Sequence, residues 1–199
     1  MKFIRSKMAV LAIVASAVPS LADNLEPPSI QNCTWCHGSS AQGYATAPRL
    51  AGQRPQYTEK QLLAFREHAR NSPSSKHMWG PAANLSHAMA RDLAIYFAAL
   101  PPKAANDGER KLVAAGRTLY ESGKPASNIV SCAVCHGPKA EGTRQIPRLG
   151  GLSYYYLKRR LEEWSKGHHA SAEAPMPQIA ASLPRNAIDA LASYLSFVR

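Results

Sequence analysis

The sequence of 199 residues predicts an all-α protein made of two tandem, related domains. Three observations lead to this prediction. A five-residue pattern, C-x-x-C-H, occurs twice, at 33–37 and at 132–136. Other residues recur at a nearly constant spacing around the two copies. Between these landmarks the apolar residues follow the i, i+3, i+4, i+7 period of amphipathic helices, and a strand–helix–strand pattern is absent.

The internal repeat has a spacing that changes by one residue along the chain. A spacing of 99 residues relates Cys33 to Cys132, His37 to His136, Pro48 to Pro147, Arg49 to Arg148, Gly52 to Gly151 and Tyr57 to Tyr156. A spacing of 98 residues relates Met78 to Met176, Leu85 to Leu183, Leu93 to Leu191 and Tyr96 to Tyr194. A one-residue deletion therefore lies between Tyr156 and Met176, and the repeat indicates a duplicated domain.

Each C-x-x-C-H pattern has the residue types and spacing of a c-type haem attachment site. Two thiols at i and i+3 lie about one helical turn apart, so both reach the vinyl groups on one edge of a porphyrin. The histidine that follows is held beneath the macrocycle, where a ring nitrogen binds the iron. We therefore predict two covalently bound haem c groups. The predicted attachment residues are Cys33, Cys36, Cys132 and Cys135, and the predicted axial histidines are His37 and His136.

Two other chemistries use paired cysteines, a zinc site and a redox dithiol. A zinc site built from all four cysteines would ignore the histidines and would require two loops 99 residues apart to converge. A thioredoxin-like dithiol needs no histidine after its second cysteine and belongs to a βαβ pattern. All 4 cysteines of the chain lie in the two motifs, and each motif carries its histidine, which favours haem.

The first 22 residues have the pattern of a cleavable export signal. Three basic residues come first, and the apolar stretch 8–18 that follows is only 11 residues long, too short to span a bilayer. Small residues at Ser20 and Ala22 suit a signal peptidase and place the mature start near Asp23, with 15–17 as a second possible site. Because c-type haem is attached on the outer side of the energy-transducing membrane, we expect a periplasmic protein. No second apolar segment follows, so we expect no transmembrane segment in the mature chain.

The first domain is predicted to span 23–100. Only ten residues, 23–32, precede Cys33, and they include Pro27-Pro28, so we expect a stub in place of a long N-terminal helix. A helix is expected over 57–70.

The rest of the first domain begins with a break in this helical pattern. We expect a polar break over 71–75 and an irregular segment over 78–81. Ser86 is expected to cap a last helix that Pro101 ends.

The second domain, 109–199, follows a linker over 101–108 and repeats this order. Its expected elements are a helix over 109–121, the second haem motif, a helix through Tyr156, Leu161 and Trp164, a polar break at 167–169, and a last helix from Pro184. Unlike the first domain, it begins with a helix of full length.

Each haem iron needs a second axial ligand, and the repeat assigns a methionine to it. Met176 is the only methionine after the motif of the second domain, and Met78 occupies the equivalent place in the first, whereas Met89 does not align. A thioether suits ferrous iron and raises the reduction potential. A second histidine would give a much lower potential. The rival histidines do not align across the repeat; they are His77, His168 and His169.

These features together closely resemble cytochrome c4. The residues that carry the resemblance are the tandem C-x-x-C-H motifs, Pro-Arg-Leu-Ala-Gly-Gln at 48–53 followed by Tyr57, and Met78 before an amphipathic Leu-x-x-Tyr-Phe helix. The resemblance covers nearly all of 30–199. It implies two tandem class I cytochrome c domains related by a pseudo-twofold axis, each wrapped around one covalent haem, which carry electrons to a terminal oxidase.

One departure from that family pattern concerns the first domain. The family fold lays an N-terminal helix across the C-terminal helix of each domain. With only a stub before Cys33, we expect Leu93 and Phe97 to be less covered than Leu191 and Leu195.

We interpret the chain as an electron carrier of a respiratory chain and not as an enzyme, because two protein ligands on each iron leave no position for a substrate. Two alternatives stay open. A dihaem peroxidase-type enzyme would need a haem without a fixed methionine. A cytochrome subunit of a periplasmic dehydrogenase would explain the stub, since a partner chain could cover the exposed face.

The expected partners are redox proteins, namely a membrane cytochrome complex, a terminal oxidase or a dehydrogenase. The formal net charge is +11, or +8 without the three basic residues of the export signal. No lysine-rich block or recognition motif accompanies this charge, and export separates the protein from nucleic acid, so we expect no nucleic-acid partner.

Overall fold

The computed structural model describes residues 27–168 and 175–199, with side chains from residue 30 onward. The predicted export signal and His169 lie outside these ranges. Within them the chain is helical, and its β pairing consists of two isolated bridges, Lys124 to Ile129 and Thr143 to Ile146. The predicted all-α class is therefore confirmed. None of the helices described is long and apolar enough to cross a membrane.

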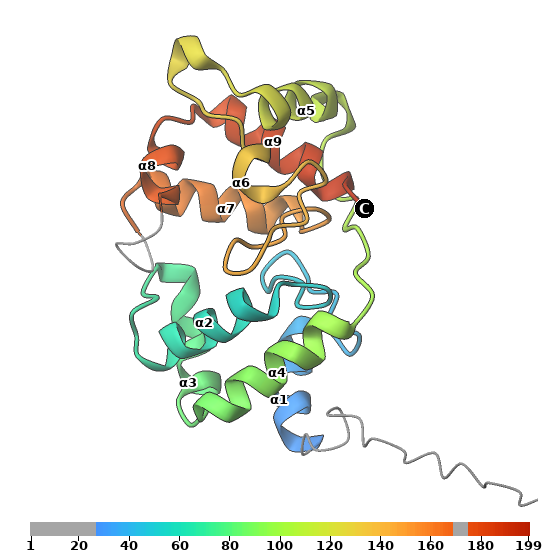
Figure 1. Ribbon diagram of the computed structural model, residues 1–199, viewed down its shortest axis with the longest axis vertical. Helices are drawn as coiled ribbons and strands as arrows, with labels where there is room; N and C mark the ends of the chain where they lie inside the picture. The colour runs from blue at the N-terminus through green and yellow to red at the C-terminus, as the bar shows by residue number, and fades with distance from the viewer. Residues whose placement is uncertain (1–26, 169–174) are drawn as a thin grey trace, which may run out of the picture.

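The helices form two groups that stack on one another (Figure 1). The first domain contains α1 (Pro27–His37), α2 (Pro55–Arg66), the 3₁₀ helix η2 (Pro73–Met78), α3 (Trp79–Ala82) and α4 (His87–Ala99). The second contains η3 (Arg110–Leu112), α5 (Val113–Ser122), η4 (Pro125–Ser127), α6 (Ala133–His136), α7 (Tyr154–Ser165), α8 (Met176–Ala181) and α9 (Arg185–Phe197).

The long helices reproduce the repeat seen in the sequence. Helices α2 and α7 have 12 residues each and begin 99 residues apart. Helices α4 and α9 have 13 residues each and begin 98 residues apart. The spacing of 99 therefore holds to the end of α7 at Ser165, and the deleted residue lies between Ser165 and Met176.

The stub expected before Cys33 is a short helical segment, 27–32, which continues into the haem motif as α1, a helix of 11 residues. Proline is tolerated in the first turn of a helix because the first N–H groups have no partner within it, so Pro27 and Pro28 begin this helix rather than prevent it. In the second domain α5 and α6 are separate elements. The two domains therefore differ in how the chain enters the motif.

The expected weaker coverage of Leu93 and Phe97 is wrong. Both are 1% exposed, against 2% for Leu191 and 3% for Leu195. Ile30 of α1 packs against the cluster that contains Leu93 and Phe97, together with residues of α2 and of the loop that follows the motif. Helix α1 and the loop that follows the motif thus cover this face.

The second domain closes its core by direct contact between α5 and α9. Gly116 lies at the contact, where a Cβ atom would overlap the backbone of Ala190. Tyr120, one turn further along α5, is fully buried, and its hydroxyl donates a hydrogen bond of 2.6 Å to the carbonyl oxygen of Gly137, next to the motif. The predicted helix over 109–121 is confirmed as η3 and α5.

The segment expected to be irregular, 78–81, is helical. Pro73 begins η2, and a single turn, α3, follows it. His68 stacks on Trp79 with ring centroids 4.1 Å apart and fixes this segment to the end of α2. The predicted cap of α4 is confirmed, since the hydroxyl of Ser86 accepts a hydrogen bond of 3.1 Å from the backbone N–H of Met89.

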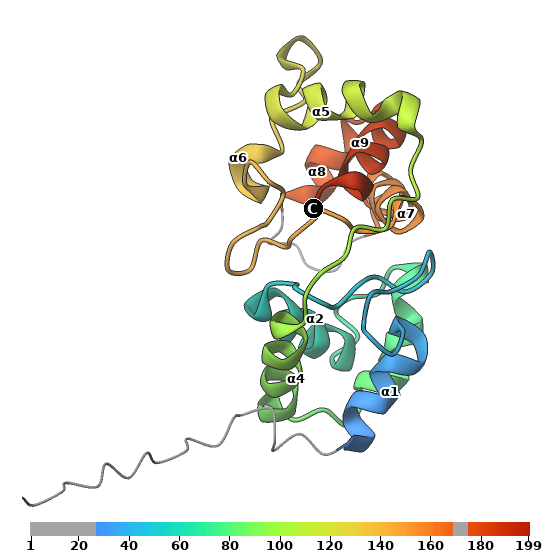
Figure 2. The ribbon, with the colours of Figure 1, turned by 90° about the vertical axis from the view of Figure 1, so that its right-hand side faces the viewer.

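The linker runs between the two domains (Figure 2) and is bound to both. Pro101 and Lys103 form hydrogen bonds with Gln42 of the first domain, and Ala105 and Asn106 with the backbone of the second. Asp107 caps α7 from outside the helix, accepting hydrogen bonds of 2.8 Å from the N–H of Tyr154 and 2.7 Å from the hydroxyl of Ser153. The N–H groups of Gly108 and Glu109 donate to serine hydroxyls of α9. A linker held in this way limits how far the domains can separate.

Candidate haem-binding sites

The two motif histidines have the same environment in both domains. The Nδ1 atom of His37 lies 2.6 Å from the carbonyl oxygen of Pro48, and that of His136 lies 3.0 Å from the carbonyl oxygen of Pro147. A carbonyl only accepts hydrogen bonds, so Nδ1 carries the proton in each ring. The lone pair of each ring is then on Nε2, which is the arrangement of a histidine that binds a metal.

Burial keeps both imidazoles neutral. His37 is 5% exposed and His136 is 6% exposed. Burial lowers the pKa of each histidine below its ordinary value, and the hydrogen bond to the prolyl carbonyl opposes this only in part. A neutral imidazole is the form that binds iron, so both rings are ready at neutral pH.

The cysteines of each motif differ in exposure in the same way in both domains. Cys33 and Cys132 are half-buried against the two core clusters, and burial raises the pKa of each thiol to about 11. Cys36 and Cys135 are exposed. A covalently attached haem c needs two thiols and a neutral imidazole. Each motif supplies this donor set from one short helical segment, with one inner and one outer thiol.

The predicted methionine ligands lie at equivalent places in the fold. Met78 is the last residue of η2 and Met176 the first of α8, and each is half-buried against the core cluster of its own domain. The rivals that the structure describes, His77 and His168, are exposed. Met89 is also exposed, at 40%. Met78 and Met176 stay predicted ligands.

Equivalent residues of the repeat meet at the junction of the two domains. Arg49 and Arg148 lie close enough for their charges to interact, and burial followed by this repulsion lowers the pKa of Arg49 to about 10. Tyr57 and Tyr156 also lie close enough to interact, and burial, with a further contribution from Tyr156, raises the pKa of Tyr57. Residues that meet their own counterparts are typical of a twofold contact, here a pseudo-twofold one.

Arg49 is one of several residues whose hydrogen bonds cross this junction, and it reaches three parts of the chain. Its guanidinium, in a residue that is 4% exposed, donates to the carbonyl oxygens of Lys103 at 2.5 Å, Gly151 at 2.9 Å and Gly150 at 2.6 Å. Its Nε donates to Ala51 within the first domain. Arg49 therefore joins the first domain, the linker and the second domain.

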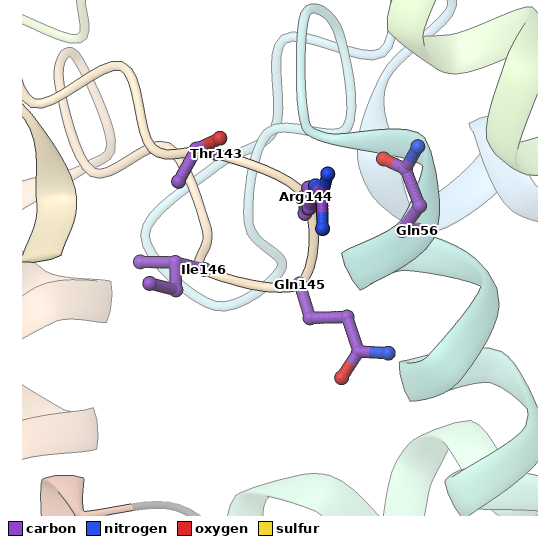
Figure 3. A pocket seen from close by; sticks show the side chains of 5 residues that line it. All are labelled: Gln56, Thr143, Arg144, Gln145 and Ile146. Atoms are coloured by element: carbon purple, nitrogen blue, oxygen red, sulfur yellow. The ribbon is translucent and has the colours of Figure 1, made fainter.

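A hollow of about 580 Å³ lies at one edge of the junction (Figure 3). Gln56 lines it from α2 of the first domain. The other four residues form a turn of the second domain, 143–146, that two backbone hydrogen bonds close, of 3.0 Å and 2.8 Å. The motif histidines are not part of this lining, so the hollow belongs to the junction and not to the iron ligands.

The two motifs identify the haem-attachment residues and axial histidines, but not the residues that hold them in place. Pro48 and Pro147 were recognised as a repeated pair, yet the hydrogen bonds that their carbonyls accept are backbone contacts with no sequence signal. The role of Arg49 at the junction was also missed. Glu163 of α7, which accepts a hydrogen bond of 3.0 Å from the N–H of Ser74 in the first domain, was missed for a different reason. Its counterpart in the repeat, Ala64, is neutral, and that contrast is the signal that could have singled it out.

Comparisons with known proteins cover both domains. A family model described as cytochrome c matches residues 29–105 and 113–198. Cytochrome c-552 of Acidithiobacillus ferridurans is 32% identical over 196 residues, which cover 96% of this chain and 84% of that protein. The thiosulfate dehydrogenase electron acceptor of Stutzerimonas stutzeri (strain A1501) is 34% identical over 184 residues, which cover 86% of this chain and 81% of that protein. The solved structure of Acidithiobacillus ferrooxidans cytochrome c4 matches with a TM-score of 0.78 and 32% identity, over 83% of this chain and 98% of that one.

Proposed function

The chain belongs to the cytochrome c family, whose domains bind covalent haem c, and we propose that it is a dihaem electron carrier of the periplasm. We place one haem on Cys33 and Cys36 in a domain over 23–100. The other lies on Cys132 and Cys135, in a domain over 109–199. The predicted resemblance to cytochrome c4 and the tandem domain fold are confirmed by the family match and by the solved structures.

The observation that carries this proposal is the repeated histidine geometry. When bound, each haem supplies an iron that gains or loses one electron. The chain holds each axial imidazole in one orientation through the Nδ1 proton, which His37 donates to Pro48 and His136 to Pro147. Because this hydrogen bond fixes the ring and raises the basicity of Nε2, the ligand position changes little between redox states.

The proposed second ligands, Met78 and Met176, would complete both coordination spheres and leave no position for a substrate. Electron carriers of this family are generally not enzymes, and the half-buried thioethers on the core of each domain fit this role. Replacing either methionine by alanine should remove half of the weak sulfur-to-iron absorption band and lower one reduction potential. An undiminished band in Met176→Ala would show that Met176 is not a ligand.

The domain junction supports rapid electron exchange between the two sites. Arg49 ties both domains to the linker, and the linker itself is bound to α7 and α9. We propose that the haems face one another across this junction and equilibrate within the protein. Cleavage of the linker should leave a haem on each half. Internal equilibration no faster than exchange between the separated halves would contradict the proposal.

A second candidate function is that of the electron acceptor, or a bound subunit, of a periplasmic dehydrogenase. Two relatives are named thiosulfate dehydrogenase electron acceptors, at 34% and 37% identity, and this favours a dehydrogenase as the electron donor. A carrier would accept these electrons in transient complexes and pass them toward a terminal oxidase. Such encounters use small interfaces whose rates depend on charge.

Two measurements separate a free carrier from a subunit. A carrier should migrate alone in gel filtration from its native source, and its oxidation by an isolated haem-copper oxidase should depend on ionic strength. Migration as a stable complex with a chain that carries another redox cofactor would favour the subunit. Failure to exchange electrons with either class of partner would contradict both.

A further inference from the structure

The short helix that ends at Met78 receives its N-terminal cap from the other domain. The N–H of Ser74, in η2, donates a hydrogen bond of 3.0 Å to Oε1 of Glu163, on α7. Ser72, directly before η2, makes no capping bond with its own side chain. Its hydroxyl accepts a hydrogen bond of 2.9 Å from Nη1 of Arg160, also on α7. Figure 1 shows the chain between α2 and α3 approaching the second domain at this place.

Glu163 and Arg160 form an ion pair that is almost completely buried. The distance between Nη1 of Arg160 and Oε2 of Glu163 is 2.6 Å, and the two side chains are 5% and 11% exposed. Burial alone would raise the pKa of Glu163, but the hydrogen bonds from Ser74 and Arg160 outweigh it, so its pKa lies below the ordinary value. A buried pair of this kind needs further hydrogen bonds to compensate for lost hydration, and Ser72 and Ser74 of the first domain supply them.

The ion pair between Arg160 and Glu163 has no equivalent in the first domain. At a spacing of 99, the counterparts of Arg160 and Glu163 on α2 are Gln61 and Ala64, which are neutral. Gln61 is used within its own domain, where its Oε1 accepts a hydrogen bond of 2.7 Å from Arg70. The hydrogen bonds that Glu163 and Arg160 make to the start of η2 are therefore an addition to the common fold, made by the second domain.

We propose that Glu163 and Arg160 are positioning residues for Met78, so that docking of the second domain sets the ligand strength and the reduction potential of the first haem. This inference rests on the proposed function, because it takes Met78 as an axial ligand. It makes the two domains unequal: the second domain tunes the first through a charged pair that α2 does not carry.

The physical basis is the weakness of a short 3₁₀ helix. Its hydrogen bonds are poorly aligned, and runs longer than a few residues are uncommon without outside support. Ser74 and Met78 are separated by four residues, or about 8 Å along such a helix, so the cap and the thioether belong to one small rigid unit. When the cap is lost, the first turn frays and the sulfur is no longer fixed by it.

The test compares the haem-loaded wild type with Glu163→Ala, Glu163→Gln and the control Glu121→Gln. Glu121 pairs with Arg117 at 3.2 Å on α5, on the side of the second domain away from the first (Figure 1). The measurements are the intensity of the sulfur-to-iron band, both reduction potentials and the rate at which imidazole displaces the methionine ligand.

In Glu163→Ala we expect a loss of up to half of the band, a lower potential for one haem only, and displacement about tenfold faster at that haem. Glu163→Gln should lie between this variant and the wild type, since its amide oxygen still accepts from the N–H of Ser74. Glu121→Gln should match the wild type. If Glu163→Ala does not fold, Ser72→Ala removes the contact to Arg160, together with the hydrogen bond between the hydroxyls of Ser72 and Ser75, without leaving a buried charge unpaired. It should change the same haem.

Wild-type behaviour of Glu163→Ala and Ser72→Ala in all three measurements would overturn the inference, and so would equal changes at both haems. A wild type without the sulfur-to-iron band would refute methionine ligation in the proposed function itself. The two failures are therefore distinguishable.

Discussion

Replacing Arg49 by alanine should weaken the junction of the two domains more than the same change at Arg148, its counterpart in the repeat. The side chain donates three hydrogen bonds that reach the linker and the second domain, at 2.5 to 2.9 Å, and the residue is 4% exposed. Two of the acceptors keep another donor, because Gly151 also accepts from Ala105 and Gly150 from Arg148. We therefore count about 1 kcal/mol for each bond, or about 3 kcal/mol in total.

The assay is guanidinium unfolding of the haem-loaded protein, followed by far-ultraviolet circular dichroism. If the free energy of unfolding falls by about 4 kcal/mol per molar of guanidinium, Arg49→Ala should lower the unfolding midpoint by about 0.7 M. Arg49→Lys should lose most of the same stability, since an ammonium group lacks the fork that reaches separate carbonyls.

The matched control is Arg148→Ala, the counterpart of Arg49 in the repeat. Arg148 donates a hydrogen bond to Gly150 within its own domain at 3.3 Å, and its removal also relieves repulsion with Arg49. Its midpoint should fall by less than about 0.2 M, corresponding to under about 1 kcal/mol. Equal shifts for the two variants would refute the idea that Arg49 holds the junction.

Three further predictions concern stability. In thermal unfolding, Gly116→Ala should lower the stability by about 1–3 kcal/mol, because its Cβ would overlap the backbone of Ala190. The control Gly80→Ala, whose Cβ would have no atom within 4 Å, should be neutral or slightly stabilising. Asp107→Ala should cost about 1 kcal/mol in the same assay by removing the cap of α7, and Asp107→Asn less, because its amide oxygen still accepts a hydrogen bond. Equal losses would contradict this and show that the cap needs the charged carboxylate. The pKa of Glu163 is lower in the folded than in the unfolded protein, so its contribution to stability is present above pH 4.5 and is lost as the pH falls further. The difference in denaturation midpoint between the wild type and Glu163→Gln should therefore shrink below pH 4.5. A difference that stays constant with pH would contradict the assignment.

Local patterns were sufficient to predict most of the fold. The last helix of each domain, and the helices α2 and α7, show their period within the sequence, and the repeat gives each of them a second, independent copy. The cap of α4 by Ser86 was also predictable, because an N-cap acts on N–H groups a few residues away. These features depend on neighbours in sequence.

The features that the sequence did not reveal depend on distant partners. Helix η2 is stabilised by Glu163, which is 89 residues away from Ser74, so 71–75 alone reads as a polar break. The coverage of Leu93 and Phe97 comes from α1 and a loop rather than from a crossing helix, which the family pattern had suggested. At the haem sites the motifs gave the residue types, but the prolyl carbonyls that orient His37 and His136 became visible only in the fold.

A redox titration of the exported protein, followed by visible and near-infrared spectra, tests the central claim that each repeated site holds a haem with one histidine and one methionine ligand. We predict two one-electron steps and, in the oxidised protein, a sulfur-to-iron band with the intensity of two haems. A spectrum without this band together with low potentials would indicate two histidines on each iron, and a haem with an open position would indicate an enzyme. Either result would contradict the account of the protein as an electron carrier with both irons bound by histidine and methionine.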